Sequence, residues 1–337
     1  MATILVTGGC GYIGSHTCVE LINLHHEVII VDNLYNSSIK VLDRIETITG
    51  VRPKFYQVDI LDREGLDQIF AENKIDAVIH FAGYKAVGES VAIPLTYYKN
   101  NISGSVNLYE AMAKANVKTV VFSSSATVYG DPASVPIKED FPLSTTNPYG
   151  TTKLYNEQIL KDVYVSDNDW SILLLRYFNP IGAHKSGLLG ETPNGIPNNL
   201  LPYIAQVATG KREFLRVWGN DYDTVDGTGV RDYIHVVDLA LGHIKAIEYA
   251  LKHKGVECVN LGTGNGYSVL QVKDAFAKAS NLEIPYQIMD RRPGDIATCY
   301  ADTTKAKELL GWSAKYNIDD MCQDAWNFAQ KNPNGIE

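Results

Sequence analysis

Cysteine is scarce in this chain, and no pair of cysteines has a zinc or redox spacing. The 337 residues include five cysteines, at positions 10, 18, 258, 299 and 322, with no C-x-x-C pair. Disulfide frameworks usually have an even number of cysteines, and structural zinc sites usually have closely spaced pairs. The sequence therefore predicts neither a disulfide framework nor a bound metal.

Long apolar runs and an excess of positive charge are also missing. No run approaches the ~18 apolar residues of a membrane helix, and the first residues have no basic stretch or signal cleavage site. We therefore expect a cytoplasmic protein without a membrane partner. Lysine and arginine total 30 against 39 aspartates and glutamates, a formal net charge of −9. Such a chain is a poor partner for nucleic acid, although a few local donors suffice for a small anion.

What the chain does have is an alternation of short apolar runs and helical patterns. The runs are rich in β-branched residues, as in strands buried on both faces of a parallel sheet. They lie at Ile4–Thr7, Val28–Asp32, Phe55–Asp59, Ala77–Ala82, Thr119–Ser125 and Ser171–Asn179. The helical patterns between them lie at Tyr12–Leu24, Ile39–Ile48, Glu64–Glu72, Tyr97–Ala115 and Tyr149–Val165. The alternation predicts an α/β fold with a doubly wound parallel sheet of the Rossmann type.

The pattern loosens after Asn179. Residues 180–202 are rich in Gly, Pro and Asn and predict a loop over the substrate. Helical patterns return at Leu201–Thr209, Asp238–Leu251, Leu270–Ala279, Lys305–Leu310 and Asp319–Ala329, with strands expected at Leu215–Trp218, Glu257–Leu261 and Tyr286–Met289. We expect a nucleotide-binding domain at 1–180 and a smaller mixed α/β lobe at 181–337. The segment near 235–250 is a candidate for return to the first domain.

Residues 7–14, TGGCGYIG, follow a predicted strand and open a predicted helix. Glycines there allow a tight turn and a close approach to a pyrophosphate, which the helix N-terminus then binds. Asp32 ends the second strand 18 residues after Gly14. Its carboxylate can accept hydrogen bonds from a ribose diol and would repel a 2′-phosphate. The glycine motif and Asp32 together predict binding of NAD rather than NADP. The alternative is a glycine-rich turn that binds no ligand.

Tyr149-x-x-x-Lys153 is the second motif. Pro148 suits a helix start, and the i,i+4 spacing puts the phenol and the ammonium on one helix face. A nearby cation favours phenolate, so we expect Lys153 to lower the Tyr149 pKa toward the working pH. Ser125 ends the fifth apolar run, at the sheet edge where such folds bind ligands. It is placed to bind the same substrate oxygen as Tyr149. The alternative for Tyr149 and Lys153 is a solvated helix face, and the alternative for the serine run is a turn at the end of a strand.

With these motifs, the chain resembles the extended short-chain dehydrogenase/reductase family, and within it the enzymes that invert UDP-sugars at C4. Four longer stretches carry the second likeness over essentially the full length. They are residues 80–90 (HFAGYKAVGES), 175–180 (LRYFNP), 195–200 (GIPNNL) and 229–236 (GVRDYIHV). The resemblance implies an isomerase of galactose metabolism. UDP-glucose and UDP-galactose are interconverted through a 4-keto sugar, with bound NAD as the hydride carrier.

The resemblance also assigns residues. Tyr149 takes the 4-hydroxyl proton, Lys153 holds the nicotinamide ribose and assists Tyr149, and Ser125 orients the 4-oxygen. With the glycine motif, the expected NAD contacts are Gly8, Gly11, Tyr12, Ile13, Gly14, Asp32, Asn33, Leu34, Tyr35, Asn36, Ser37, Asp59, Ile60, Phe81, Ala82, Gly83, Tyr84, Lys85, Asn100, Ser125, Tyr149, Lys153 and Phe178. The expected UDP-sugar contacts are Lys85, Ser125, Tyr149, Asn179, Asn199, Leu200, Arg231, Tyr233, Arg292, Asp295 and Cys299.

Three of these residues have open alternatives. Arg231 and Arg292 suit a diphosphate clamp, because guanidinium groups bind phosphate oxygens in pairs. The bare sequence favours surface ion-pair arginines instead, and only the resemblance reverses that preference. Cys299 falls where narrow-specificity relatives carry tyrosine. A small side chain there leaves room for an N-acetyl group, which predicts turnover of UDP-N-acetylglucosamine and UDP-N-acetylgalactosamine. The alternative is a buried cysteine without influence on specificity.

The sequence pattern and the resemblance of this chain also raise two alternative functions and a homodimer. An NDP-sugar 4,6-dehydratase also begins by oxidising C4, but it needs a carboxylate pair where residues 124–127 read Ser-Ser-Ala-Thr. A non-catalytic NAD-binding scaffold would not need Ser125, Tyr149 and Lys153 together. By the same resemblance, the helices at Tyr97–Ala115 and Tyr149–Val165 imply a homodimer.

Overall fold

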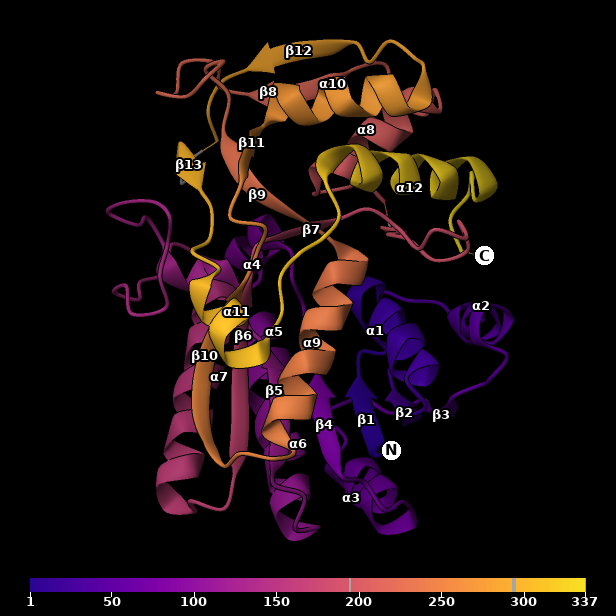
Figure 1. The fold of residues 1–337 in the computed structure, drawn as a ribbon, viewed down its shortest axis with the longest axis vertical. Coiled ribbons are helices and arrows are strands. Elements are labelled where there is room, and N and C mark those ends of the chain that lie inside the picture. The colour runs from indigo at the N-terminus through magenta and orange to yellow at the C-terminus, as the bar shows by residue number, and fades with distance from the viewer. Residues whose placement is uncertain (194, 293–294, 337) are drawn as a thin grey trace.

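The computed structural model describes residues 1–193, 195–292 and 295–336 and is organised around one large parallel sheet (Figure 1). Its strand order is β10-β6-β5-β4-β1-β2-β3, and every pairing is parallel. The strands are β1 (Thr3–Thr7), β2 (Glu27–Val31), β3 (Lys54–Tyr56), β4 (Ala77–His80), β5 (Thr119–Ser123), β6 (Ser171–Tyr177) and β10 (Gly255–Leu261). The chain winds in opposite directions from β1, so the sheet confirms the predicted doubly wound α/β fold.

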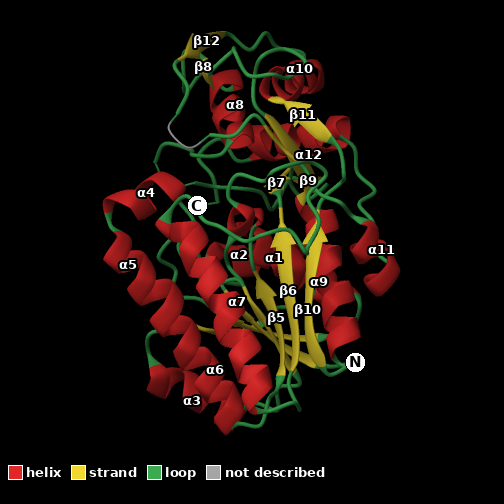
Figure 2. Ribbon diagram, turned by 90° about the vertical axis from the view of Figure 1, so that its left-hand side faces the viewer, coloured by secondary structure: helices red, strands yellow, loops and turns green. Residues whose placement is uncertain are grey.

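Helices cover both faces of this sheet because its strands bury side chains in both directions. In β1, Ile4 and Val6 enter one hydrophobic cluster, and Leu5 enters the other. On the first face lie α1 (Tyr12–Asn23), α2 (Lys40–Thr49) and α9 (Val236–Ala250). On the second lie α3 (Arg63–Glu72), α6 (Gly104–Lys114) and α7 (Pro148–Ser166). Figure 2 shows the sheet between α6 and α7 on one side and α9 on the other.

The helix expected at Tyr97–Ala115 is present but not regular. It begins as α5 (Pro94–Tyr98), widens into the π turn η1 (Lys99–Ser103) and continues as α6. A further short helix, α4 (Val87–Ala92), precedes α5. Single π turns are rare and frequently mark functional sites, and this one contains the predicted cofactor residue Asn100.

A second group of elements lies beyond the carboxyl ends of the large sheet. There β9 (Val230–His235) pairs with β7 (Asn179–Ile181), β11 (Gly266–Ser268) and β13 (Thr298–Cys299), while β8 (Leu215–Trp218) pairs with β12 (Tyr286–Met289). The helices α8 (Leu200–Ala208), α10 (Val269–Ser280) and α12 (Ile318–Lys331) pack around a third hydrophobic cluster. The strands β7, β9, β11 and β13 were not predicted; they are short or carry polar residues.

Part of the chain after residue 181 belongs to the large sheet. The segment near 235–250 forms α9, which packs against α1, and β10 then forms the sheet edge beside β6. After β10, the helix α11 (Thr304–Leu310) packs on the same region. The large sheet thus includes strands from both sides of the predicted domain boundary at residues 180 and 181. The division into two domains stays a prediction. Among the described residues, no helix has the length and apolar character needed to cross a membrane.

Candidate active site

The glycine turn between β1 and α1 has no space for a side chain at Gly8 or Gly14. Gly8 has a φ of +72°, and a Cβ there would lie 2.9 Å from the Ala82 nitrogen. A Cβ on Gly14 would lie 2.3 Å from the Gly8 carbonyl oxygen. Gly11 is the N-cap of α1 and provides no side-chain cap for its first turn. The turn therefore offers backbone N–H groups and a helix N-terminus to an anion, as NAD requires.

Asp32 is fixed beside this turn at the end of β2. Its buried carboxylate accepts from the Cys10 amide at 3.0 Å, the Leu34 amide at 2.9 Å and the Ser37 hydroxyl at 2.9 Å. A carboxylate has about four lone-pair positions, so acceptor capacity remains for a ribose diol. Next to it, Asn33 donates to Asp59 at 2.8 Å and joins the ends of β2 and β3. The structure thus brings the predicted cofactor residues of both strands together.

The three consecutive serines at the end of β5 have three different partners. Ser123 donates its hydroxyl to the Tyr177 hydroxyl at 2.8 Å. Ser124 donates to the Glu157 carboxylate at 2.6 Å. Ser125 accepts from the backbone and the hydroxyl of Thr127 at 3.2 and 3.0 Å. Ser125 also hydrogen-bonds Tyr149 and thereby lowers the Tyr149 pKa, which singles out the predicted serine among the three.

Tyr149 and Lys153 lie on the first turns of α7 and are both buried. The helix starts at Pro148, and Asn147 caps it by accepting from the Gly150 amide at 2.9 Å. Lys153 Nζ donates to the Ser123 carbonyl at 2.7 Å and lies 6.0 Å from the centre of the Tyr149 ring. The carbonyl contact anchors the lysine to β5, which ends two residues before Ser125. The structure therefore assembles the three predicted catalytic residues in one place.

We predicted that the Tyr149 pKa is lowered, and with the groups of the protein alone this prediction is wrong. Burial, and then Tyr177, raise the Tyr149 pKa well above its ordinary value, while Ser125 and the Lys85 charge oppose the rise. Burial also lowers the pKa of Lys153 to about 8. Desolvation dominates both groups because both lie inside the protein, where the charged forms of a phenol and an amine lose hydration.

Asn101 is a site residue that the sequence reasoning missed. It lies in the π turn, where its Oδ1 accepts from the Tyr84 amide at 2.8 Å and from the Asn100 side chain at 2.9 Å. Its Nδ2 donates to the Tyr84 carbonyl and to Thr152 Oγ1, both at 3.0 Å. One buried amide thus joins the loop after β4 to α7. A π turn leaves no spacing signal, so no sequence pattern distinguishes Asn101.

Glu191 is the second missed residue, on the side expected to bind the UDP-sugar. Its Oε1 accepts from Lys85 Nζ at 3.0 Å and from Asn199 Nδ2 at 2.6 Å. Two predicted residues more than 100 positions apart are therefore joined through one carboxylate. Glu191 lies inside the Gly- and Pro-rich stretch that we expected to cover the substrate, but nothing in its local sequence distinguishes it.

The charges of the two predicted arginines both act on Tyr233 of β9. Burial raises the pKa of Tyr233 to about 12, and Arg231 and Arg292 both oppose this rise. Arg231 donates to the Val230 carbonyl at 2.8 Å and is in register with Cys299 of β13. Arg292 is half exposed and pairs with Asp295 at 2.8 Å. The arginines thus approach one region from two segments, as a clamp requires.

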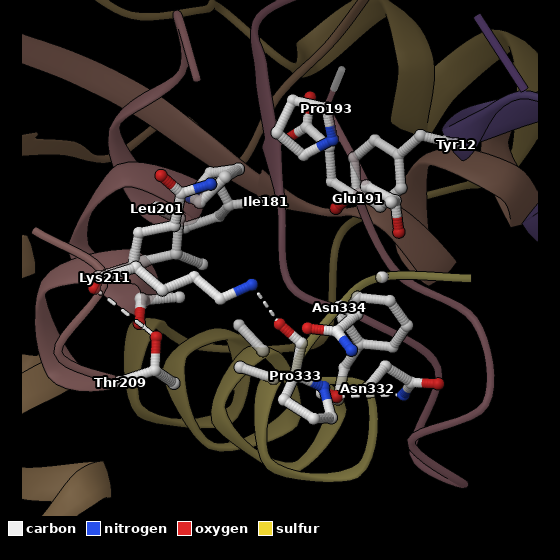
Figure 3. Close-up of a pocket in the computed structure, with 18 of the residues that line it drawn as sticks. Tyr12, Ile181, Glu191, Pro193, Leu201, Thr209, Lys211, Asn332, Pro333 and Asn334 are labelled. Atoms are coloured by element: carbon white, nitrogen blue, oxygen red, sulfur yellow. Dashed lines mark hydrogen bonds between the residues drawn. The ribbon is translucent and has the colours of Figure 1, made fainter. Parts of the chain in front are cut away.

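Phe178 is buried and Asn179 is exposed where β6 passes into β7, and Leu200 begins α8. Tyr12 donates to the Gly182 carbonyl at 2.7 Å. It also lines a cavity of about 260 Å³ between α8, α12 and the C-terminal segment (Figure 3). Neither Tyr149 nor Arg231 is on its wall, so this cavity is separate from the predicted catalytic group. Within the described residues, no group of three or more His, Cys, Asp or Glu side chains is arranged to hold a metal.

Comparison with known proteins agrees with this geometry. The family described as GDP-mannose 4,6 dehydratase matches residues 5–325. The UDP-glucose 4-epimerase of Bacillus subtilis is 64% identical, over 99% of this chain and 98% of that protein. The crystal structure of UDP-glucose 4-epimerase from Bifidobacterium longum in complex with NAD+ and UDP has a TM-score of 0.96 and 58% identity, covering 99% of both chains. The UDP-Glc/GlcNAc 4-epimerase from Campylobacter jejuni has a TM-score of 0.86 and 35% identity, covering 98% of this chain and all of that one.

The doubly wound sheet, the glycine turn and the Ser-Tyr-Lys group define the class of extended short-chain dehydrogenases and reductases. Identities of 56–64% over nearly the whole chain narrow that class. The chain belongs to the UDP-glucose 4-epimerase family.

Proposed function

We propose that this protein interconverts UDP-glucose and UDP-galactose at C4, through a 4-keto sugar and with NAD bound. The observation that carries the proposal is the grouping of Ser125, Tyr149 and Lys153 at the carboxyl end of β5. The Lys153–Ser123 bond and the shared position of Tyr149 and Lys153 on α7 hold that group together. Full-length relatives named UDP-glucose 4-epimerase support it.

The cofactor pocket fits NAD by two features of the structure. A Cβ on Gly8, Gly9 or Gly14 would collide with neighbouring atoms, and Asp32 is held in place by three donors with acceptor positions to spare. The solved relative with NAD+ and UDP supports the assignment. When bound, NAD supplies reversible hydride transfer at the sugar C4.

The protein's own groups manage the proton. Tyr149 as phenolate accepts the proton of the sugar 4-hydroxyl and later returns it, because a base within hydrogen-bond reach serves as general acid in reverse. Ser125 donates its hydroxyl proton to the 4-oxygen. Burial raises the Tyr149 pKa, and the charge of Lys85 lowers it in part. We infer that Lys153 adds to this positive charge and that the positive ring of oxidised NAD would add more when the cofactor is bound, which favours phenolate.

The matching family is named for a dehydratase, an activity that would need further catalytic groups. Removal of water across C5 and C6 needs a free acid and base beside Ser125. The carboxylate that contacts this segment, Glu157, accepts from Ser124 and from two nitrogens of Arg176. Glu157 is therefore committed to an ion pair, and residues 124–127 contain no carboxylate. The site supports epimerisation over elimination.

The test is to mix the purified protein with UDP-galactose and no added NAD. Formation of UDP-glucose supports the proposal. A 4-keto-6-deoxy product would show a dehydratase, and no turnover by a folded, NAD-loaded sample would show a scaffold; either result overturns the proposal.

We propose further that N-acetylated UDP-sugars are substrates. Cys299 is small, partly buried and in register with Arg231, at the expected sugar end of the site. The relative named as a UDP-Glc/GlcNAc 4-epimerase supports this range. Cys299→Tyr should abolish turnover of UDP-N-acetylgalactosamine and spare UDP-galactose, while Cys299→Ala should keep both. Absence of turnover in the unaltered protein, or unchanged activities in Cys299→Tyr, would contradict the proposal.

We also propose a homodimer that pairs the helices α4, α5 and α7. Their outer surface exposes large apolar side chains, at Val87, Val91, Ile93, Leu95 and Tyr155, and α4 and α5 each contact α7. Leu95 is 82% exposed, and an apolar patch of this kind is typical of a protein interface. Leu95→Glu should convert a dimer to a monomer in sedimentation experiments; a protein that is already monomeric would contradict the proposal.

A cytoplasmic location is the last part of the proposal. All five cysteines are free thiols, and Cys10, Cys18 and Cys322 are buried. Free thiols are usual in reducing compartments. Microscopy of the tagged protein in its own cells should show a diffuse cytoplasmic signal, and a signal confined to the envelope would contradict this location.

A further inference from the structure

A buried ion pair lies directly behind the proposed catalytic group. Arg176 of β6 donates from Nε to Glu157 Oε1 at 2.9 Å and from Nη2 to Oε2 at 2.6 Å. The two side chains are 2% and 0% exposed. Glu157 lies on α7, one turn after Lys153 and two turns after Tyr149. The pair therefore fixes the rotation of α7 relative to β6.

The same carboxylate holds the end of β5. Ser124 donates to Glu157 Oε1 at 2.6 Å, and its neighbour Ser125 is the proposed ligand of the sugar 4-oxygen. Three segments that carry the proposed catalytic residues, or border on them, meet at Glu157: the end of β5, the helix α7 and the strand β6. Beyond it, Arg176 donates to Tyr129 Oη at 3.1 Å and to the Glu139 carbonyl at 3.0 Å. The guanidinium has no freedom to follow a shift of the carboxylate.

Stability gives a weak reason for such a pair. The desolvation of two charges is costly, and apolar residues of similar volume often replace a buried ion pair without loss of stability. A bidentate arginine–carboxylate pair, by contrast, fixes distance and orientation strongly. Catalytic groups need such control, since a displacement of about 1 Å can reduce a rate about 100-fold.

We propose that Glu157, clamped by Arg176, is a positioning residue that sets the location of Ser125 relative to Tyr149 through its bond to Ser124. The proposal rests on the proposed function, because it assigns Ser125 and Tyr149 to the same sugar oxygen. Glu157 itself touches neither substrate nor cofactor. Its carboxylate acts through the end of β5 on one side and through α7 on the other.

Ser124→Ala is the gentlest test, because it removes one hydroxyl and leaves the ion pair in place. With the NAD-loaded protein, we expect kcat for UDP-galactose to fall about 10-fold, since Ser125 loses its fixed position. KM and NAD content should stay within about twofold, because the UDP and NAD contacts lie elsewhere. Glu157→Gln should lower kcat further, since one acceptor of the Arg176 guanidinium becomes a donor.

Two control variants separate positioning from general destabilisation. Asp238→Asn alters another buried carboxylate, which accepts from the backbone amides of Lys315 and Tyr316 at 2.8 and 2.9 Å. Lys161→Ala removes the outer cation that lies 3.9 Å from Glu157. Both should leave kcat unchanged whatever they do to the melting temperature.

The outcomes are distinct from a failure of the proposed function. If the unaltered protein does not turn over UDP-galactose, the proposed function fails. If it does, and Ser124→Ala retains its full kcat, the positioning role is overturned. It is also overturned if Asp238→Asn lowers kcat as much as Ser124→Ala at an equal loss of melting temperature.

Discussion

The two ends of the proposed active site are built in different ways. At the cofactor end, the backbone of Gly8–Gly14 and the buried carboxylate of Asp32 are fixed by short bonds within the protein. At the sugar-nucleotide end, the candidates are long side chains, and Arg292 is half exposed and paired with Asp295. The first end is preformed. At the second end, Arg292 would have to exchange Asp295 for a phosphate if it belongs to the proposed clamp.

This difference predicts how each end responds to substitution. A preformed turn tolerates little change, because its geometry depends on the absence of side chains. A clamp of two arginines tolerates more, because each guanidinium contributes separately and the half-exposed Arg292 remains hydrated when it is unbound. We therefore expect changes at the cofactor end to be all-or-none and changes at the sugar-nucleotide end to be graded.

The largest effect is expected for Gly14→Ala. The added methyl group would meet the Gly8 carbonyl at 2.3 Å, so the turn must open and its N–H groups must separate. The purified protein should contain no NAD and show no epimerase activity. Gly88→Ala is the matched control, because a Cβ there meets nothing within 4 Å. Normal NAD content in Gly14→Ala would show that the cofactor end is not preformed.

Tyr149→Phe is expected to lower kcat about 1,000-fold, because the proton acceptor is lost. NAD content should be unchanged, since the turn and Asp32 remain. Tyr164→Phe, farther along α7, serves as the control and should keep full activity. A loss of less than about tenfold in Tyr149→Phe would remove this residue from the catalytic group.

The sugar-nucleotide end should give the graded response. Arg292→Met is expected to raise KM for UDP-galactose about 10- to 100-fold, as expected for loss of a hydrogen bond to a charged group, with kcat little changed. Arg291→Met is the neighbouring control, since that arginine pairs with Asp221 at 2.7 Å. Equal effects of the two substitutions would contradict the clamp.

The smallest effect concerns Lys153 and pH. Burial lowers the Lys153 pKa to about 8 from 10.5. Between these values the unfolded chain binds more protons than the folded chain, so the free energy of unfolding rises with pH. Lys153→Met removes this dependence. The free energy of unfolding of Lys153→Met, relative to that of the unaltered protein, should therefore fall by about 1 kcal/mol between about pH 7 and about pH 9. Denaturant unfolding at the two pH values measures this difference. A parallel pH profile would contradict the burial of a charged amine.

The sequence was sufficient to predict those features that depend on residues close together in the chain. The glycine turn and the strand ends at Asp32 and Ser125 depend on neighbouring residues and on periodicity, so the doubly wound fold could be predicted. The likeness to known sequences then supplied Arg231 and Arg292, which spacing alone leaves as surface residues. In the structure both arginines influence Tyr233, a convergence that no local pattern records.

The features that were missed depend on tertiary contacts. Asn101 acts through a π turn, and Glu191 joins Lys85 to Asn199 across more than 100 residues. The error about the Tyr149 pKa has the same origin. The i,i+4 spacing reports that Lys153 is near, but it does not report that the phenol is buried or that Lys153 donates to the Ser123 carbonyl.

The most direct test of the account is the fate of the hydrogen at C4. UDP-galactose carrying deuterium at C4 is converted in ordinary water by the purified protein without added NAD, and the UDP-glucose formed is examined by mass spectrometry and NMR. The account predicts that deuterium remains at C4, because a preformed cofactor end retains NAD while the sugar turns over. Replacement of the deuterium by solvent hydrogen, or a requirement for added NAD, would contradict it.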